Sequence, residues 1–220
     1  MSSQLPSFLR IELLSDATFS RGGGTPGVVD IEVEHDDYGL PFIGGRTVRG
    51  LLRDAWLSMH RYFPELEPAA VRVLGKNRAL DESCRLRVGD ALLPAPVREA
   101  VRRAVERREP SPLPPETILA ALTSIRYQTA EERETGAPAE VTLRSSRVVL
   151  RGLFFDARLT WLSDGAPADP ASAAEDRRLL ALCALAVRHG GMLRNRGRGH
   201  LRVTLDGDLE LTRRWAGGAA

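Results

Sequence analysis

Alternating apolar and polar positions predict four β-strands along the chain, over residues 8–14, 85–93, 148–162 and 200–205. Apolar positions repeat at helical spacing in three other stretches. The first helix is predicted to begin near Thr47 and the second to cover residues 97–108. The third is predicted to begin at Asp169 or Ser172 and to end at Gly190. Residues 28–33 read as a further short extended segment.

The order of these elements (β, α, β, insertion, β, α, β) predicts an α+β fold of the ferredoxin-like or RRM-like type. In this fold two helices pack on one face of an antiparallel sheet. The length of 220 residues fits a single domain, residues 1–220. We place an inserted helical segment at residues 94–147 and expect its weakly apolar part, residues 123–147, to protrude as a hairpin or loop.

Composition permits a sizeable core, since 43% of the residues are apolar, but only 5% are aromatic, which disfavours a surface built mainly from stacking platforms. The net charge of +2 by itself indicates no class of partner. Cys84 and Cys183 lie far apart without metal-ligand spacing, so neither a disulfide framework nor a zinc site is expected. The sequence has no membrane-span or signal-peptide pattern, so we expect a cytoplasmic protein with no membrane partner.

The basic residues are concentrated locally, above all in segment 188–202, RHGGMLRNRGRGHLR, which has five arginines, four glycines and no acidic residue. Glycine lets backbone N–H groups approach a ligand closely, and arginine matches phosphate oxygens, so this segment is predicted to bind an RNA backbone. The candidate contacts are Gly190, Gly191, Arg194, Arg196, Gly197, Arg198 and Gly199. The alternative is an ordinary connection between a helix and a strand whose arginines face water.

Three more arginines, Arg46, Arg49 and Arg53, share one face of the first helix. The first turns of a helix normally favour acidic residues, so we expect an anionic partner opposite these arginines; a solvated helix face is the alternative. Arg21 precedes three glycines and is a further candidate RNA contact. No Gly-Lys-Ser/Thr sequence follows these glycines, which argues against a nucleotide hydrolase.

Four sequence blocks, taken in order, identify a family. They are VVDIEVEHDDYGLPFIGGRTVRGLLR, RLRVGDALL, SIRYQTAEERETGAPAEVTLRSSRVVLRGLFFDARL and GGMLRNRGRGHLRV. Together they resemble the RAMP superfamily of CRISPR-associated proteins, most closely the catalytic backbone subunit of type III effector complexes. In this resemblance the first block begins the first helix, the third is a thumb followed by a strand, and the last is the glycine-rich loop. Gly44-Gly45-Arg46-Thr47 stands where the family usually has Pro-Gly-Ser-Ser.

The resemblance implies a subunit that assembles with other type III subunits on a CRISPR guide RNA (crRNA) and cleaves complementary single-stranded target RNA. It implies Asp30 as the catalytic residue, which would bind a divalent cation, expected to be Mg²⁺, accept a proton or position the RNA. It also implies a thumb that contacts RNA, with Ile125, Arg126 and Arg144 as candidates. Without the resemblance, Asp30 is equally an ordinary acidic loop residue.

Two other functions stay open on the sequence. One is the same fold as a non-catalytic structural or capping subunit, which would bind guide RNA without cutting target RNA. The other is a stand-alone RRM-like RNA-binding module. The sequence disfavours that module, because Phe154-Phe155 is a poor match for the aromatic strand on which such domains stack bases.

Overall fold

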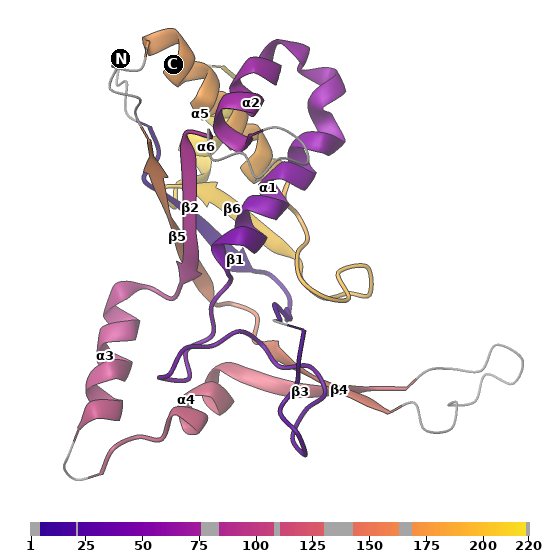
Figure 1. The fold of residues 1–220 in the computed structure, drawn as a ribbon, viewed down its shortest axis with the longest axis vertical. Helices are drawn as coiled ribbons and strands as arrows, with labels where there is room; N and C mark the ends of the chain where they lie inside the picture. Colours follow the sequence, from indigo (N-terminus) through magenta and orange to yellow (C-terminus); the bar gives the residue numbers. More distant parts are fainter. Residues whose placement is uncertain are drawn as a thin grey trace, which may run out of the picture.

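The computed structural model describes residues 5–20, 22–75, 84–107, 111–129, 143–162 and 169–218. Within them the main sheet has four strands, which run antiparallel in the order β2-β5-β1-β6 (Figure 1). They are β1 (Phe8–Leu13), β2 (Leu86–Leu92), β5 (Phe154–Trp161) and β6 (Leu201–Leu205). Strands β1 and β5, the first and third of the four in chain order, form the centre of the sheet, and β2 and β6 form its edges. This is the predicted ferredoxin-like arrangement.

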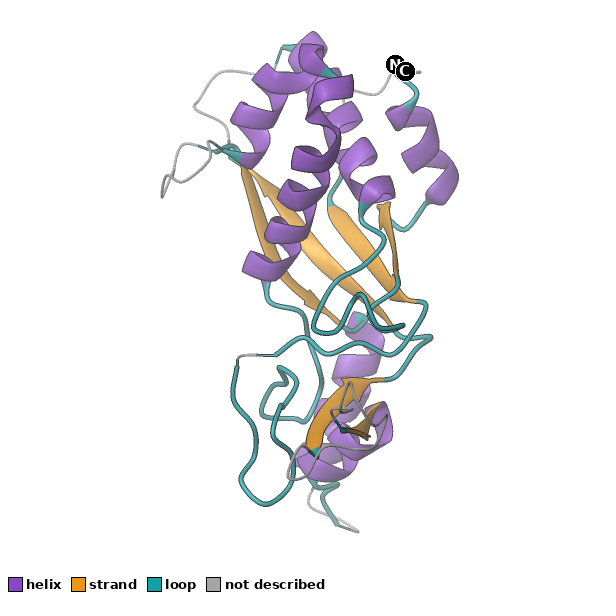
Figure 2. Cartoon of the chain, turned by 90° about the vertical axis from the view of Figure 1, so that its right-hand side faces the viewer, coloured by secondary structure: helices purple, strands orange, loops and turns teal. Residues whose placement is uncertain are grey.

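Helices cover one face of this sheet, as Figure 2 shows, and the main core lies between the two layers. Those that pack on the strands are α1 (Gly45–Met59) and α5 (Pro170–Ala186), with α2 (Glu67–Leu74) and α6 (Leu209–Ala216) packed against α5. Strand β1 contributes Leu9, Ile11 and Leu13 to the core, and the residues between them are half-buried on the other face. The alternation of apolar and polar residues in this segment therefore corresponds to the two faces of the sheet, with the apolar residues on the face that the helices cover.

The inserted region forms a second body of structure below the main sheet in Figure 1. It contains α3 (Ala95–Glu106), α4 (Pro115–Leu122), β3 (Thr123–Gln128) and β4 (Arg144–Val149). Strands β3 and β4 pair antiparallel as a sheet of their own, and residues 130–142 between them lie outside the described part of the chain. Two short 3₁₀ helices, η1 (His60–Tyr62) and η2 (Pro64–Leu66), join α1 to α2.

Three sequence predictions of element boundaries were wrong. Residues 148–162 form the end of β4 and all of β5, which belong to different sheets and are separated by a turn in which Gly152 has φ +87°. Residues 28–33 make isolated bridges rather than a strand. Helix α5 ends at Ala186, four residues before Gly190, because the chain from Arg188 turns to pair with β6: the Leu201 amide donates to the Arg188 carbonyl at 2.8 Å.

Helices α2, α4 and α6 were not predicted, since each has only eight residues, which is too short to establish a helical period. Asp169 caps α5 as one of the two predicted alternatives, its carboxylate accepting from the Ser172 amide at 3.2 Å. No helix in the described ranges is both long enough and apolar enough to cross a membrane.

Candidate functional site

The glycine-rich segment folds back on itself and on the loop after β1. The Gly190 amide donates to the Gly199 carbonyl at 2.9 Å, and the Gly199 amide donates to the Asp16 carbonyl at 2.8 Å. The Met192 amide reaches the Thr18 carbonyl at 2.9 Å. These bonds close the segment into a loop whose two ends are joined, so the residues between them are held out from the end of the sheet.

Two of the predicted glycines are needed for this closure. Gly191 has φ +82°, and a Cβ at this position would lie 2.6 Å from the Thr18 carbonyl oxygen. Gly199 has φ +68°, and its Cβ would collide with the Gly190 carbonyl. The backbone therefore requires glycine at both positions, and their contact with RNA stays a prediction.

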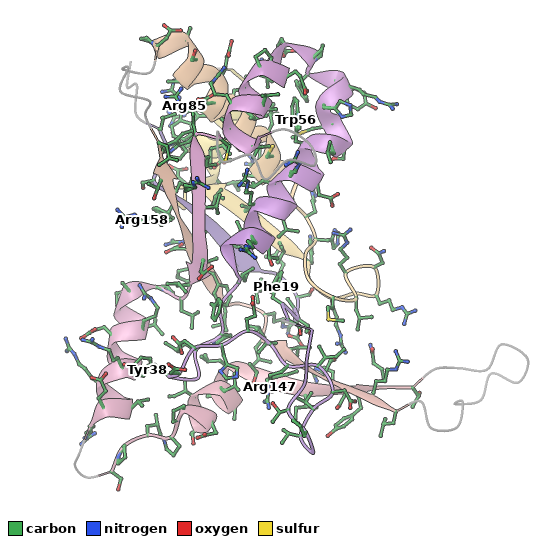
Figure 3. The ribbon with its side chains drawn as sticks, in the orientation of Figure 1. Phe19, Tyr38, Trp56, Arg85, Arg147 and Arg158 are labelled. Carbon is green, nitrogen blue, oxygen red and sulfur yellow. The ribbon has the colours of Figure 1, made fainter. Side chains whose placement is uncertain are left out.

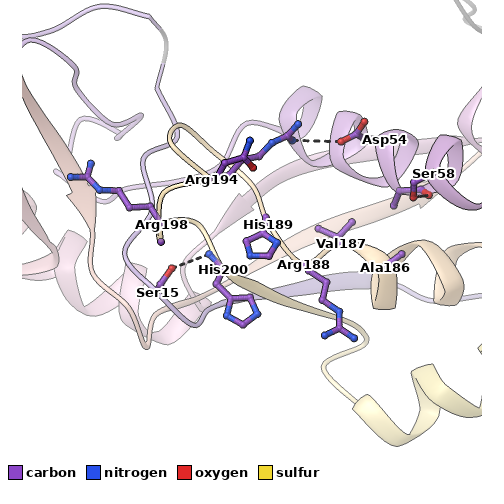
Figure 4. A pocket seen from close by; sticks show the side chains of 13 residues that line it. Ser15, Asp54, Ser58, Ala186, Val187, Arg188, His189, Arg194, Arg198 and His200 are labelled. Carbon is purple, nitrogen blue, oxygen red and sulfur yellow. Dashed lines mark hydrogen bonds and ion pairs between the residues drawn. The ribbon is translucent and has the colours of Figure 1, made fainter. Parts of the chain in front are cut away.

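The loop forms one wall of a groove of about 720 Å³, and the second half of α1 forms the other wall (Figure 4). Arg194 reaches across the groove to Asp54 of α1, with 3.5 Å between Nη1 and Oδ2. His189 and His200 stack beside the loop with ring centroids 5.1 Å apart. Arg196 is exposed, and no carboxylate of the described residues lies within ion-pair distance of it. The groove thus places cationic side chains along one wall.

Arg198 connects this loop to the inserted region. Its Nη1 donates to Oγ of Ser146 on β4 at 2.9 Å, and Ser146 is buried. Burial lowers the pKa of Arg198, and the positive charge of Arg126 lowers that pKa further. The carboxylate of Asp16, which forms an ion pair with Arg126, acts in the opposite direction and raises the pKa of Arg198.

Asp30 lies against the adjacent residue of β4. Its Oδ2 accepts two hydrogen bonds from Ser145, from the amide at 2.6 Å and from the hydroxyl at 2.9 Å. The Asp30 amide in turn donates to the Ser145 hydroxyl oxygen at 2.9 Å. Asp30 is exposed to solvent. Its carboxylate is therefore oriented by the base of the β3–β4 sheet and accessible from outside.

These contacts hold the Asp30 carboxylate in its ionised form. The hydrogen bond from the Ser145 amide lowers the pKa of Asp30 most, followed by the Ser145 hydroxyl and by the charge of Arg144. The neighbouring Arg147 forms a half-buried ion pair with Glu32 at 2.7 Å, and the Arg147 amide donates to the Ile31 carbonyl at 2.9 Å. Figure 3 labels Arg147 at this junction. The segment carrying Asp30 is thus fixed to β4 on both sides of Ile31.

Strand β4 brings together three features that are far apart in the sequence. Ser145 binds Asp30, and Ser146 binds Arg198 of the glycine-rich loop. Both serines lie at the base of the predicted thumb. Sequence reasoning missed these two residues, because a serine pair inside a strand has no recognisable signature. The polar pair between apolar segments in VTLRSSRVVL is the one available signal.

The predicted thumb residues lie on β3 and β4. Arg126 forms an ion pair with Asp16 at 2.8 Å, and Ile125 is half-buried. Arg144 is exposed at the start of β4, where its charge acts on Asp30. Contact of these side chains with RNA stays a prediction.

The three arginines of α1 have different surroundings. Arg46 is exposed, whereas Nη2 of Arg49 points inward and donates to the Leu74 carbonyl and to Sγ of Cys84, both at 3.0 Å. Arg53 is half-buried and lines a separate small pocket between α1 and α2. The three arginines therefore do not form one exposed surface on α1. Arg49 instead caps the C-terminal end of α2.

The anionic partners at the start of α1 are protein carboxylates. The Gly45 amide donates to Asp90 of β2 at 2.7 Å, and the Gly44 amide donates to Glu34 at 3.2 Å. These carboxylates satisfy free N–H groups of the first turn and oppose the positive end of the helix dipole. This explains how α1 begins without an acidic residue of its own.

Some of the sequence predictions have no counterpart in the described residues. Arg21 lies outside them. No group of three or more His, Cys, Asp or Glu side chains in the described ranges could hold a metal ion. The Mg²⁺ ion expected from the resemblance stays a prediction. Cys84 and Cys183 are both buried, and neither forms a disulfide bond among the described residues.

Comparison with known proteins matches this fold to one family. The sequence profile of the RAMP superfamily matches residues 10–202. A chain in the cryo-EM structure of the type III-B Cmr-beta complex bound to cognate target RNA superposes with a TM-score of 0.65, at 10% identity over 94% of this chain and 99% of that chain. A chain of the apo complex gives 0.64, at 11% identity over 93% and 98%. No curated protein sequence matches. Because the family profile covers most of the sequence and the fold agrees, this chain belongs to the RAMP superfamily.

Proposed function

We propose that this chain is a guide-RNA-binding backbone subunit of a type III CRISPR effector complex and that it cleaves complementary single-stranded target RNA. The observation that carries the proposal is the junction at β4. There Ser145 orients Asp30 while Ser146 anchors Arg198 of the glycine-rich loop. Consecutive residues of β4, whose side chains point to opposite faces of the strand, thus hold the proposed cleavage residue on one face and an arginine of the proposed phosphate-binding loop on the other.

Guide RNA would lie along the groove between the loop and α1. Arg188, Arg194 and Arg198 line this groove, Arg196 is exposed on the same loop, and arginine binds phosphate oxygens in a forked geometry. Gly197 of the loop has open space around it, which leaves room for a backbone to approach. Arg46 at the exposed start of α1 would extend the same basic surface.

Asp30 would act on the target strand near the base of the thumb. RNA can be cut by its own 2′-hydroxyl when the attacking oxygen, the phosphorus and the leaving 5′-oxygen are held in line. The lowered pKa makes Asp30 a weak proton acceptor, so binding of a cation or orientation of the RNA suits it better than general base catalysis. Ser145 then acts as the residue that positions the carboxylate.

A divalent cation, which we infer to be Mg²⁺, fits the donor chemistry of Asp30. Magnesium ions commonly use one or two carboxylates and complete their coordination with water and substrate phosphates. Asp30 offers an exposed, ionised carboxylate for this purpose. When bound, the cation would supply charge stabilisation at the cleaved phosphate.

One of the two type III-B Cmr-beta structures that share this fold is bound to cognate target RNA, and the other is the apo state. We therefore propose that this chain works with neighbouring copies or related subunits on one guide RNA. The β3–β4 sheet would contact the guide–target duplex, through Ile125, Arg126 and Arg144 among others.

The test is cleavage of a complementary RNA by the complex assembled with its guide RNA and Mg²⁺. We expect regularly spaced cuts with the wild type and a loss of at least about 100-fold with Asp30→Ala and Asp30→Asn, without loss of target binding. Asp37→Ala is the matched control, because Asp37 is also an exposed loop aspartate. Its cleavage rate should equal that of the wild type.

Other outcomes separate the alternatives. Equal cutting by wild type and Asp30→Ala would move the chemistry to another residue or subunit. Binding of target RNA without any cutting would make this chain a structural subunit. Failure to bind guide RNA at all would reject the proposed function.

A further inference from the structure

The face of the main sheet opposite the helices carries a mixed aromatic and cationic surface. Along this face the strand side chains are exposed or half-buried, apart from Thr204. Figure 3 shows Arg158 pointing away from the sheet on this side, and Figure 2 shows the helices on the other. We call this surface the open face, defined by Arg87, Phe8, Arg10, Glu12, Phe154, Asp156, Arg158, Thr160 and Arg202.

Two phenylalanines lie on its two central strands. Phe8 of β1 and Phe154 of β5 point to the same side, and Arg10 lies between them. Its guanidinium carbon is 4.5 Å from the Phe154 ring centroid and 5.5 Å from that of Phe8. The sequence analysis considered Phe154 as a stacking residue but did not consider Phe8, which lies 146 residues earlier in the chain.

Arg10 is fixed in this position by a two-pronged contact with Asp156. Nε and Nη2 each donate to one carboxylate oxygen at 2.8 Å. The ring, the guanidinium plane and the second ring are thus arranged before any ligand binds. Aromatic rings and arginine planes on sheet surfaces are the groups on which proteins stack unpaired bases.

The open face also carries a net positive charge. Its four arginines face two carboxylates, and those carboxylates pair with Arg10 and Arg202. Arg87 and Arg158 are exposed, and within the described residues no carboxylate lies at ion-pair distance from either. Arg158 is directly opposite Phe8 in the sheet register, and Arg87 is opposite Thr160. Arg158 therefore lies beside Phe8, and Arg87 lies further along the same face on the edge strand β2.

From this arrangement we propose that the open face binds single-stranded RNA, with a base stacked on Phe154, whose ring Arg10 holds in place, and phosphates bound by Arg87 and Arg158. RNA fits this surface better than an acidic protein segment does, because the planar aromatic and guanidinium groups are suited to stacking with planar bases. The neighbouring arginines match its phosphates.

This site is separate from the groove proposed for the guide RNA. That groove is lined by Asp54 and Ser58 of α1, which is on the covered side of the sheet. None of the residues proposed here to bind RNA, Phe154, Arg87 and Arg158, lines that groove. The open face would therefore bind a different stretch of RNA, such as one that leaves the guide–target duplex.

The experiment measures binding of a short labelled oligouridine to the full chain over a range of salt concentrations. It starts from Arg194→Ala/Arg196→Ala, which weakens the groove. In that background Phe154→Ala should weaken the remaining binding by about 5- to 150-fold. Arg87→Ala/Arg158→Ala should reduce the slope of log affinity against log salt by about 1.4. Arg213→Ala on α6 is the control, since Arg213 is an exposed arginine paired with Glu210.

Phe154→Leu is a second variant that keeps an apolar side chain and removes the aromatic ring, in case Phe154→Ala disturbs the fold. It should weaken RNA binding while leaving the unfolding midpoint near that of the wild type. Cross-linking with 4-thiouridine RNA provides an independent readout. We expect cross-links in the peptide that contains Phe154.

Cross-links confined to the glycine-rich loop, with unchanged affinity in the open-face variants, would overturn this inference and leave the proposed function intact. Loss of binding in the open-face variants alone would support the inference and count against the groove. If these variants instead released a protein subunit from the assembled complex and left RNA binding unchanged, the open face would be a protein interface and the inference would be wrong.

Discussion

Asp30 and Ser145 bind each other reciprocally, although 115 residues separate them in the sequence. The carboxylate accepts from the serine amide and hydroxyl, and the serine hydroxyl oxygen accepts from the aspartate amide. This pairing lowers the pKa of Asp30, chiefly through the amide hydrogen bond. The orientation of the proposed cleavage residue is therefore set by β4, at the base of the predicted thumb.

Replacing Ser145 by alanine should impair cleavage more than RNA binding. The variant keeps the amide bond to Asp30 and loses the hydroxyl, so the carboxylate is oriented less firmly and the cleavage rate should fall by up to about 100-fold. Single-turnover cleavage measures the rate, and filter binding measures target affinity. Ser145→Thr keeps a hydroxyl and should restore most of the activity. A similar loss in both variants would contradict a positioning role.

The same substitution should change the pH dependence. The folded-state pKa of Asp30 lies below its unfolded value, so its stabilising contacts are present above the unfolded pKa and are lost as the pH falls through the folded pKa. Removing the Ser145 hydroxyl raises the pKa of Asp30. The acidic limb of the cleavage profile should therefore move to higher pH in Ser145→Ala, and a carboxyl NMR titration should show the same direction. An unchanged titration would show that the amide alone sets this pKa.

Gly199→Ala should destabilise the glycine-rich loop and the protein. Besides the positive φ, its methyl group would collide with the Gly190 carbonyl, and we expect a loss of about 3 kcal/mol in the free energy of unfolding. Gly197→Ala is the matched control: Gly197 also has a positive φ, +77°, but open space surrounds it. Its cost should be about 1 kcal/mol. Urea unfolding compares the two, and equal losses would mean that the loop does not require close contact at Gly199.

The arginines of the loop and of α1 should respond differently to removal. Arg196→Ala should lower the salt dependence of RNA binding by up to about 0.7 in slope and leave stability unchanged, because its side chain is exposed. Arg49→Ala removes the donor to the Leu74 carbonyl and should cost about 1–3 kcal/mol of unfolding free energy with no change in slope. A reduced slope with normal stability in Arg49→Ala would restore its predicted role in RNA binding.

Asp176 on α5 should be important for stability. Its carboxylate is almost completely buried and accepts from Nη2 of Arg72 on α2 at 2.6 Å. Asp176→Ala leaves the half-buried guanidinium with a weaker partner, so we expect a loss of about 3 kcal/mol. Glu175→Ala is the control, because Glu175 pairs with the same arginine but is about half exposed, and its loss should be below about 1 kcal/mol. Thermal and urea unfolding should agree on this ranking.

Much of the fold could be predicted because the strands and long helices have clear periods. The alternation in β1 and the apolar stripe of α1 follow directly from which side faces the core. The boundary between β4 and β5 could not be predicted, because residues 148–162 stay strand-like while the chain changes sheets at Gly152. Local periodicity does not show which partner a strand pairs with.

The parts of the candidate site that could be predicted are those whose residues lie close together in the sequence. The glycine-rich loop could be found from composition, since its arginines and glycines lie in one short segment. Arg49 looked equivalent to Arg46 by spacing, yet it points to α2, whose end lies 25 residues further along. Spacing identifies a shared helix face but not what is packed against it.

The sequence by itself determined the order of the elements, the faces that are buried and the basic loop, because these depend on the properties of neighbouring residues. Only the tertiary structure decided that Asp30 binds Ser145, that Arg198 binds Ser146 and that Phe8 and Phe154 flank Arg10. Each of these contacts joins segments that are distant in the chain. Their geometry depends on strand pairing and on the closure of long loops, which no local pattern of residues encodes.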